Sequence, residues 1–474
     1  MGMDTQGLSF TGSTEASVFY DRALDHLVRF QTEVIEAQAS ARAADPRCAM
    51  AGVLGAYLSL MSTEAPSVAD ARAALGGIAG NPDALAPREQ AHLAAAGLWL
   101  AGDMMGTGAI LADISLLWPR DLLALFVGHQ IDFFTGDAVS LRDRIGRAMW
   151  AWTPHDRLYG FVQGMYAFGL EECNLYGLSE EMAQRAVEAN HDDVWGIHAM
   201  VHTYEMQGRI AEGVRFMRAR HANWSAGNFL NVHNSWHYAL YLLQGDDVPG
   251  ALAVYDRVLH HGGSEDVALE LLDASALLWR LHLEGQAVGD RWRPLADAWG
   301  RLLTSGYYPF NDMHATMAFI GAGDLERGRD LVADLEGLVE RDDHESSSWI
   351  MTSRVGLPVC RSLLAFGDGA YEQVLRELWP VRTRLHEFGG SHAQRDAMER
   401  TLLESAIRAP RLDVARALVN ERLGVREMST YTWSKYAEAL TGMGDESGAS
   451  VASNRARVLA NEILAAAKAP TKTE

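Results

Sequence analysis

Residues 195–209, WGIHAMVHTYEMQGR, have the pattern of one α-helix that ends at a glycine turn. Trp195, His198, His202 and Glu205 stand three, four and three residues apart, so they share one stripe of that helix. A solvent-facing stripe would mix Lys and Glu, and a core stripe would be rich in Leu and Ala. The segment therefore predicts a helical fold and marks one of its helices as the wall of a polar site.

The rest of the chain has the same helical character. Ala, Leu, Arg and Glu dominate, apolar residues recur every three or four positions, and alternating strand patterns are nearly absent. We therefore expect an all-α protein. The first helices are predicted at Thr14–Ala44, Cys48–Met61, Val68–Gly77 and Pro87–Leu100.

Glycine turns punctuate these helices at roughly 31- to 44-residue intervals, which is typical of a helix-turn-helix solenoid. The pattern indicates an α-solenoid of tetratricopeptide-like hairpins. We expect one solenoid domain over residues 1–474, with frayed tails at 1–12 and 467–474. The predicted turns are Gly102-Asp103, Gly136-Asp137, Tyr176-Gly177, Gly208-Arg209, Gly245-Asp246, Gly285, Gly323-Asp324, Gly367-Asp368 and Gly444-Asp445.

Longer phrases carry a closer resemblance. They are GMYAFGLEE (164–172), the 195–208 segment, NSWHYAL (234–240), DASALLWR (273–280) and GSHAQRD (390–396). Together they resemble the tetratricopeptide repeat protein 38 family over about residues 13–460. The resemblance implies a single α-solenoid and supplies no established reaction.

Composition bounds the partners and the compartment. The net charge of −21 argues against nucleic acid and anionic membrane surfaces as partners. No apolar run approaches the ~18 residues of a membrane span, and the N-terminus has no signal-peptide pattern. Three cysteines without a CxxC motif suit a reducing compartment, so we expect a cytoplasmic protein.

A second histidine pair, His233 and His237, repeats the four-residue spacing one hairpin after the first pair. Both lie off the inner stripe of their own helix, and if they turn toward helix 195–208, four imidazoles and a carboxylate converge. The site would bind a small polar or anionic molecule. Its expected ligand-binding residues are Trp195, Glu171, Ser235, Asp273, Ser275, Trp279, His314, His392 and Arg395.

Acid–base hydrolysis is the leading interpretation of the cluster. His198 and His202 would move protons, Glu205 would orient them, and His233 and His237 would complete the catalytic set. No GxSxG elbow or nucleophilic cysteine motif is present, so activated water, or a serine such as Ser235 or Ser275, would attack.

Metal binding is an alternative, although no cofactor is predicted and HExxH is absent. A divalent ion such as zinc would be held by His198, His202, Glu205 and His237. A third alternative is a non-enzymatic protein-interaction scaffold, with a protein partner or a second copy of the chain.

Charged residues outside the cluster suggest two more contacts. The planar guanidinium of Arg395 suits a carboxylate or phosphate. Asp273 and Arg280 are seven residues apart, on one helical stripe, and are expected to pair.

Overall fold

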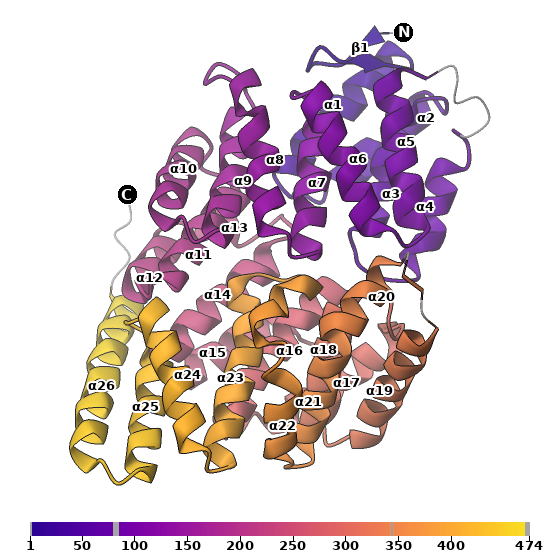
Figure 1. Cartoon of the computed structure of the whole chain (residues 1–474). Helices are drawn as coiled ribbons and strands as arrows, with labels where there is room; N and C mark the ends of the chain where they lie inside the picture. Colours follow the sequence, from indigo (N-terminus) through magenta and orange to yellow (C-terminus); the bar gives the residue numbers. More distant parts are fainter. Residues whose placement is uncertain (1, 79–84, 342, 345, 470–474) are drawn as a thin grey trace.

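The computed structural model describes residues 2–78, 85–341, 343–344 and 346–469, and its helices follow one another as antiparallel hairpins (Figure 1). The predicted all-α solenoid of tetratricopeptide-like hairpins is confirmed. The first half contains α1 (Thr14–Val28), α2 (Val34–Ala44), α3 (Ala49–Leu60), α4 (Ser67–Leu75), α5 (Pro87–Leu100), α6 (Met104–Leu117), α7 (Leu122–Phe134), α8 (Ala138–Ala148), α9 (Tyr159–Glu172), α10 (Tyr176–Ala189), α11 (Val194–Met206), α12 (Ile210–Ala219) and α13 (His221–Trp224).

The second half continues the same alternation. It contains α14 (Asn231–Gln244), α15 (Val248–Val254), α16 (Ala268–Leu283), α17 (Trp292–Leu302), α18 (Pro309–Gly321), α19 (Leu325–Glu340), α20 (Ser347–Met351), α21 (Leu357–Gly367), α22 (Tyr371–Leu378), α23 (His392–Arg408), α24 (Leu412–Val425), α25 (Thr430–Gly442) and α26 (Glu446–Lys468). Short 3-10 helices lie at η2 (Met149–Ala151), η4 (Gly289–Arg291) and η6 (Arg382–Phe388), and π-helical turns at η3 (Tyr255–Leu259) and η5 (Thr352–Gly356).

The Gly-Asp turns work through two local effects. Gly102, Gly136, Gly323 and Gly444 have φ between 70° and 91°, the left-handed conformation that ends a helix. The aspartate that follows each glycine caps the next helix by accepting a hydrogen bond from a backbone N–H three residues on. Each Gly-Asp pair therefore ends one helix and starts its partner.

Three predicted turns are misplaced. Gly367 is the last residue of α21, and the left-handed residue that follows it is Gly369, with φ 73°. Gly177 lies inside α10, and the turn before α10 is made by Asn174, whose φ is 61°. At 245–247, Asp246 takes the left-handed conformation instead of Gly245, and Asp247 caps α15. Asn and Asp tolerate this conformation better than other non-glycine residues, so the turn can move by a residue.

The predicted Thr14–Ala44 helix is wrong in one respect, because it is two helices, α1 and α2. Phe30 adopts φ 56° between them, and Gln31 forms an isolated bridge with Asn228. The ring of Phe30 stacks on Trp195 with centroids 5.0 Å apart. The chain therefore interrupts the helix at Phe30, whose ring makes an aromatic contact with α11.

Residues 2–12, expected as a frayed tail, are packed. β1 (Gly2–Met3) pairs antiparallel with β2 (Ser9–Phe10), and Phe10 is buried. Asp4 between the strands lies 3.2 Å from the buried guanidinium of Arg88. Gln6 accepts a hydrogen bond from the backbone of Leu122. These polar contacts fix the segment without an apolar pattern that the sequence would reveal.

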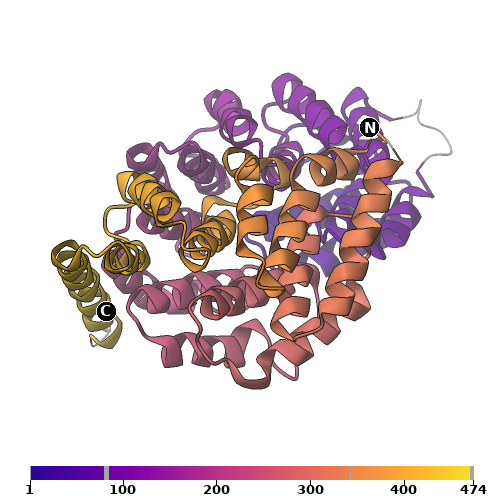
Figure 2. The same ribbon diagram turned by 60° about the horizontal axis from the view of Figure 1, so that its bottom comes forward.

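The superhelix brings distant parts of the chain together (Figures 1 and 2). α23 packs against α11 and α16, and α26 packs against α12 and α14. Ile463 and Ala466 of α26 join the apolar cluster around Val214. α26 runs to Lys468, into the predicted 467–474 tail, whose residues 470–474 lie outside the described residues.

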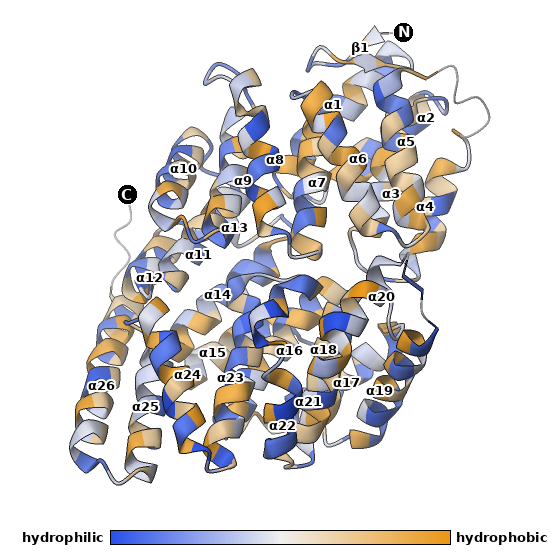
Figure 3. Ribbon diagram, in the orientation of Figure 1, coloured by the Kyte–Doolittle hydropathy of each residue, from blue (hydrophilic) through white to orange (hydrophobic). Residues whose placement is uncertain are grey.

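Hydrophobic and hydrophilic residues alternate along most helices (Figure 3). Among the described residues, no helix combines the length and apolar character needed to cross a membrane.

The turn at Gly136 supports a stability prediction. A Cβ placed there would lie 1.7 Å from the His386 carbonyl oxygen, whereas at Gly285 it would meet nothing within 4 Å. The two φ angles are 70° and 69°, so Gly285→Ala measures the left-handed strain alone. We expect Gly285→Ala to cost about 1 kcal/mol and Gly136→Ala at least about 2 kcal/mol more, in urea unfolding. Equal costs would mean that the Gly136–His386 contact is not formed.

Candidate functional site

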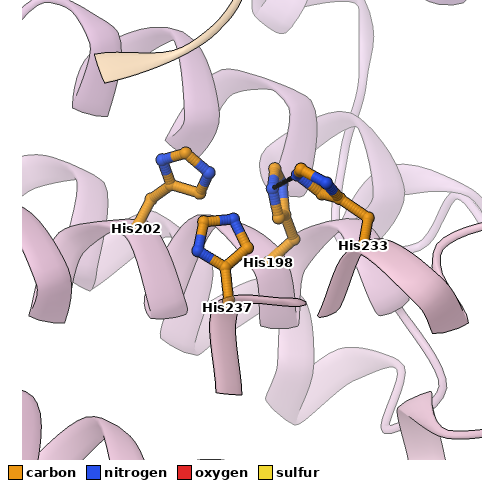
Figure 4. A group of neighbouring side chains, drawn as sticks. All are labelled: His198, His202, His233 and His237. Atoms are coloured by element: carbon orange, nitrogen blue, oxygen red, sulfur yellow. Dashed lines mark hydrogen bonds between the residues drawn. The ribbon is translucent and has the colours of Figure 1, made fainter. Parts of the chain in front are cut away.

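Four imidazoles meet between α11 and α14. His198 and His202 come from successive turns of α11, and His233 and His237 from successive turns of α14 (Figure 4). The Nε2 atoms of His198 and His233 are 3.1 Å apart, and the His198–His202 and His202–His237 ring centroids are 4.3 and 4.4 Å apart. The predicted convergence of the two histidine pairs is thus present in the structure.

Carboxylates hold the outer nitrogens of the α14 histidines. Nδ1 of His233 lies 2.8 Å from Asp273 of α16, and Nδ1 of His237 lies 2.9 Å from Glu205 of α11. If each Nδ1–H donates to its carboxylate, both rings present Nε2 lone pairs to the interior. Glu205 therefore pairs with His237, and not with the α11 histidines that the sequence predicted it to orient.

Glu171 of α9 takes the place expected for Glu205. Its Oε2 lies 3.5 Å from Nδ1 of His202, and both side chains are fully buried. Neither Glu171 oxygen and neither His202 nitrogen has a hydrogen-bond partner among the described protein groups. Such buried polar atoms normally bind something, so this part of the site is built to take a ligand atom, an ion or water.

Burial keeps the imidazoles of His198, His202 and His237 neutral at neutral pH. Loss of solvation lowers the pKa of His198 and His237 well below the usual value, and neighbouring imidazoles lower it further. For His202 burial outweighs the attraction of Glu172 and Glu205, and its pKa falls to about 4. Neutral imidazoles keep free lone pairs at neutral pH, which is the form that binds metal ions.

Two adjacent glutamates on α9 carry opposite shifts. Burial, with the charge of Glu172 beside it, raises the pKa of Glu171 well above normal. Burial also opposes ionisation of Glu172, but His392 and Arg395 prevail and hold its pKa below normal. Burial would lower the pKa of His392, yet the Glu172 carboxylate raises it overall. Glu171 is thus the protonated member at neutral pH and Glu172 the ionised one.

Aromatic rings enclose the α11 side of the cluster. The rings of Trp195 and Phe168 lie 4.8 and 5.1 Å from that of His198, and Phe30 covers Trp195. Sequence reasoning missed Phe30, Phe168 and Glu172. Phe168 and Glu172 lie in the GMYAFGLEE segment. The position of Glu172 directly after Glu171 was the one sequence feature that could have indicated its role.

Several predicted ligand residues have structural partners instead. Ser275 donates to Leu271 O and accepts from Trp299 Nε1, so its hydroxyl proton and one of its lone pairs are already used. Trp279 Nε1 donates to Thr401, and His314 Nδ1 donates to Phe310 O. The side chains of Ser275, Trp279 and His314 are therefore part of the protein core. Ser235 is buried on α14, the helix that carries His233 and His237.

The expected Asp273–Arg280 pair is not formed. Asp273 is bonded by His233, while Arg280 donates to the carbonyls of Ala276 and Ala393. Arg280 also lies over the Trp236 ring. Seven-residue spacing placed both side chains on one stripe, but neighbouring helices supplied closer partners.

His392 and Arg395 line a separate cavity. Both approach Glu172 at 3.2 Å, and all three line an open cavity of about 560 Å³. The described lining includes none of the four clustered imidazoles. Glu172 therefore touches the cavity, while its neighbour Glu171 touches the histidine cluster.

The cluster has the donor set of a transition-metal centre. One ring nitrogen from each of the four histidines lies within 4.8 Å of the others, and Glu171, Glu172 and His202 form a second such group. Nitrogens bound to one zinc ion stand about 3.3 Å apart, from Zn–N bonds of about 2.05 Å. The residue types are those that bind divalent transition metals, and the four-histidine group contains His233 where the predicted ligand set had Glu205.

Comparisons with solved structures find helical proteins at low sequence identity. No protein-family model matches the chain. A monomeric IFIT1 mutant with Gppp-AAAA shares 14% identity and a TM-score of 0.38 over 96% of this chain and 97% of that chain. The TPR domain of P58(IPK) shares 12% identity and a TM-score of 0.22 over 81% of this chain and 97% of that chain. Likeness this low carries no argument about activity.

Proposed function

We propose that this protein holds a divalent transition-metal ion in the four-histidine cluster and uses it to hydrolyse a small polar or anionic molecule. The observation that carries the proposal is the orientation of the rings. Asp273 and Glu205 hold the outer nitrogens of His233 and His237, so the inner Nε2 of His237 has no protein partner and that of His233 faces Nε2 of His198 at 3.1 Å. Carboxylate support of this kind is the usual outer shell of a histidine-bound metal.

The chain's own groups would handle the proton. The carboxyl group of Glu171 lies beside His202, and its raised pKa favours the protonated carboxylic acid. The next residue, Glu172, is ionised. A bound divalent ion would polarise a substrate oxygen and lower the pKa of water. Glu171, which is protonated at neutral pH, would donate its proton from Oε to the leaving group and take a proton back from the attacking water, so that the carboxylic acid is restored.

Metal analysis is the direct test. Protein purified without chelators or an affinity tag, then loaded with Zn²⁺, Mn²⁺, Fe²⁺ or Ni²⁺ in turn, should retain about one ion per chain of at least one metal after desalting. Retention of no metal would contradict the proposal. In that case the alternative function, a protein-interaction scaffold without a metal, would be favoured.

Metal retention should depend on pH in a specific way. Burial lowers the pKa of His202 to about 4, so its ring stays neutral well below the ordinary value of 6.5. The ion should therefore remain bound at pH 5.5 and leave as the pH falls toward 4, measured by metal content after desalting at each pH. Surface histidines would release their ions near 6.5, and release there would contradict the buried site.

Hydrolysis itself should depend on Glu171. We expect the metal-loaded protein to cleave at least one member of a panel of small phosphate esters, carboxylic esters and N-acyl amino acids. Glu171→Gln, which keeps the shape but cannot ionise, should lower kcat about 100-fold at unchanged metal content. Glu212→Gln is the control, since Glu212 lies half exposed on α12 and pairs with Arg209. Metal binding without cleavage of any panel member would contradict the hydrolytic part alone.

A further inference from the structure

We infer that the cavity beside α23 is a binding site for a small organic oxyanion, a carboxylate or a phosphate, that leads to the histidine cluster. The cavity of about 560 Å³ is lined by six segments of the chain. These are the start of α6, the α7–α8 turn, the end of α9, the end of α20 with η5, the η6 helix and the first two turns of α23. Its volume suits a molecule of modest size.

The acidic groups of this cavity already have close partners. Glu387 accepts two hydrogen bonds from Arg384, at 2.6 and 2.8 Å. Glu399 accepts one from Arg422 at 2.7 Å. Asp137 caps α8 through the backbone of Ser140 at 2.9 Å, and Glu172 accepts from the backbone N–H of His392 at 3.0 Å. None of these carboxylates needs a cation from outside.

The basic groups are less fully engaged. Arg354 and Arg382 approach their nearest carboxylates, Glu387 and Glu421, only at 3.7 Å. Arg395, which also lines the cavity, donates to the Gly390 carbonyl and shares Glu172 with His392 at 3.2 Å. Each guanidinium has five N–H donors in a planar fork, so spare donors remain for an oxyanion. With the acids paired and the arginines loosely paired, the cavity favours an anion.

Two further features indicate a site. Arg354 lies on the π-helical turn η5, a local distortion that occurs frequently at functional sites. Ile350, Leu385 and Val139 add an apolar wall, which suits a short hydrocarbon part attached to the anion. His386 also lines the cavity, and burial lowers its pKa, so its ring carries no positive charge at pH 7.

Glu172 connects this cavity to the proposed reaction. It lines the cavity, and Glu171, one residue before it, faces His202 at 3.5 Å. The role of the cavity as the substrate's binding site rests on the proposed metal centre. Anion binding in the cavity does not, because Arg354 and Arg382 come from other elements than the four histidines.

Matched probes test the inference by isothermal titration calorimetry at pH 7. Phenylphosphonate and phenylacetate carry the two oxyanion types on similar apolar parts, and benzyl alcohol is the neutral control. We expect at least one anion to bind with a Kd in the low millimolar range or tighter, and benzyl alcohol not to bind measurably. The preferred anion identifies the oxyanion. Equal binding of the neutral probe, or binding of neither anion, would overturn the inference.

Variants then locate the site. Arg354→Gln with Arg382→Gln should raise the Kd of the preferred anion at least tenfold at unchanged metal content, because both side chains stand on the cavity rim. Arg329→Gln, at an exposed arginine of α19 paired with Asp368, should leave it unchanged. An unchanged Kd in the double variant would overturn the inference. A metal-free His202→Gln/His237→Gln protein that still binds the anion would reject the metal centre as the anion's site and support the cavity.

Discussion

Replacing His202 and His237 together by Gln should reduce bound metal from about one ion per chain to below about 0.1, measured by elemental analysis after loading and desalting. Both residues are fully buried and contribute nitrogens to the four-histidine group. Gln keeps hydrogen-bonding capacity toward Glu205 and Glu171 but gives up the imidazole lone pair. The loss of metal should therefore occur without loss of the fold.

His314→Gln is the matched control for this double variant. His314 is equally buried, and burial lowers its pKa to about 3, but it lies on α18 outside the cluster. It should retain the full metal content. If the double variant keeps its metal while circular dichroism shows a native helical signal, the ion is bound elsewhere and the proposed centre is wrong.

Asp396→Asn should lower the free energy of unfolding by about 3–5 kcal/mol, because it removes a buried charge that three arginines share. The Asp396 carboxylate lies 2.7 Å from Arg400, 2.6 Å from Arg422 and 3.4 Å from Arg426. Burial would raise the pKa of Asp396, but these arginines hold it well below normal. Urea unfolding at pH 7 measures the loss of stability. Because Arg422 lies on α24, the ion pairs of Asp396 join α23 to α24.

The pH dependence of this loss has a defined sign. The folded pKa of Asp396 lies below the unfolded value of 3.8, so its stabilisation is complete above that value and is lost as the pH falls through the folded pKa. The difference between wild type and variant should be constant from pH 5 to 8 and shrink below about 4. Asp413→Asn, at an exposed pair with Arg411, should leave the free energy of unfolding nearly unchanged, because solvent screens the pair. Equal costs at the two positions would contradict the buried network.

Local sequence rules identified the helices well because the signals that form them are local. Pro87–Leu100 was located to the residue, since proline starts the helix and a glycine turn ends it. The errors arose where a long-range contact decides the backbone. Phe30 breaks the first helix to stack on Trp195, more than a hundred residues away, and nothing near Phe30 in the sequence signals that contact.

Helical spacing also identified the centre of the site. The four-residue intervals of His198–His202 and His233–His237 placed each pair on one face of its helix. The sequence does not determine whether the histidines of α14 face α11. The packing of the two hairpins against each other decides that they do. The same spacing predicted Ser275 and Trp279 as ligand residues. In the structure Ser275 accepts a hydrogen bond from Trp299, and Trp279 donates one to Thr401.

The sequence by itself determined the all-α solenoid, its Gly-Asp turns and the concentration of histidine on two neighbouring helices, because each depends on residues within about two turns of one another. Only the tertiary structure decided which carboxylate serves which imidazole. Glu205 bonds His237, Asp273 bonds His233, and Glu171 faces His202, and each of these pairs joins two different helices. The superhelix sets those distances, and a periodicity within one helix does not encode them.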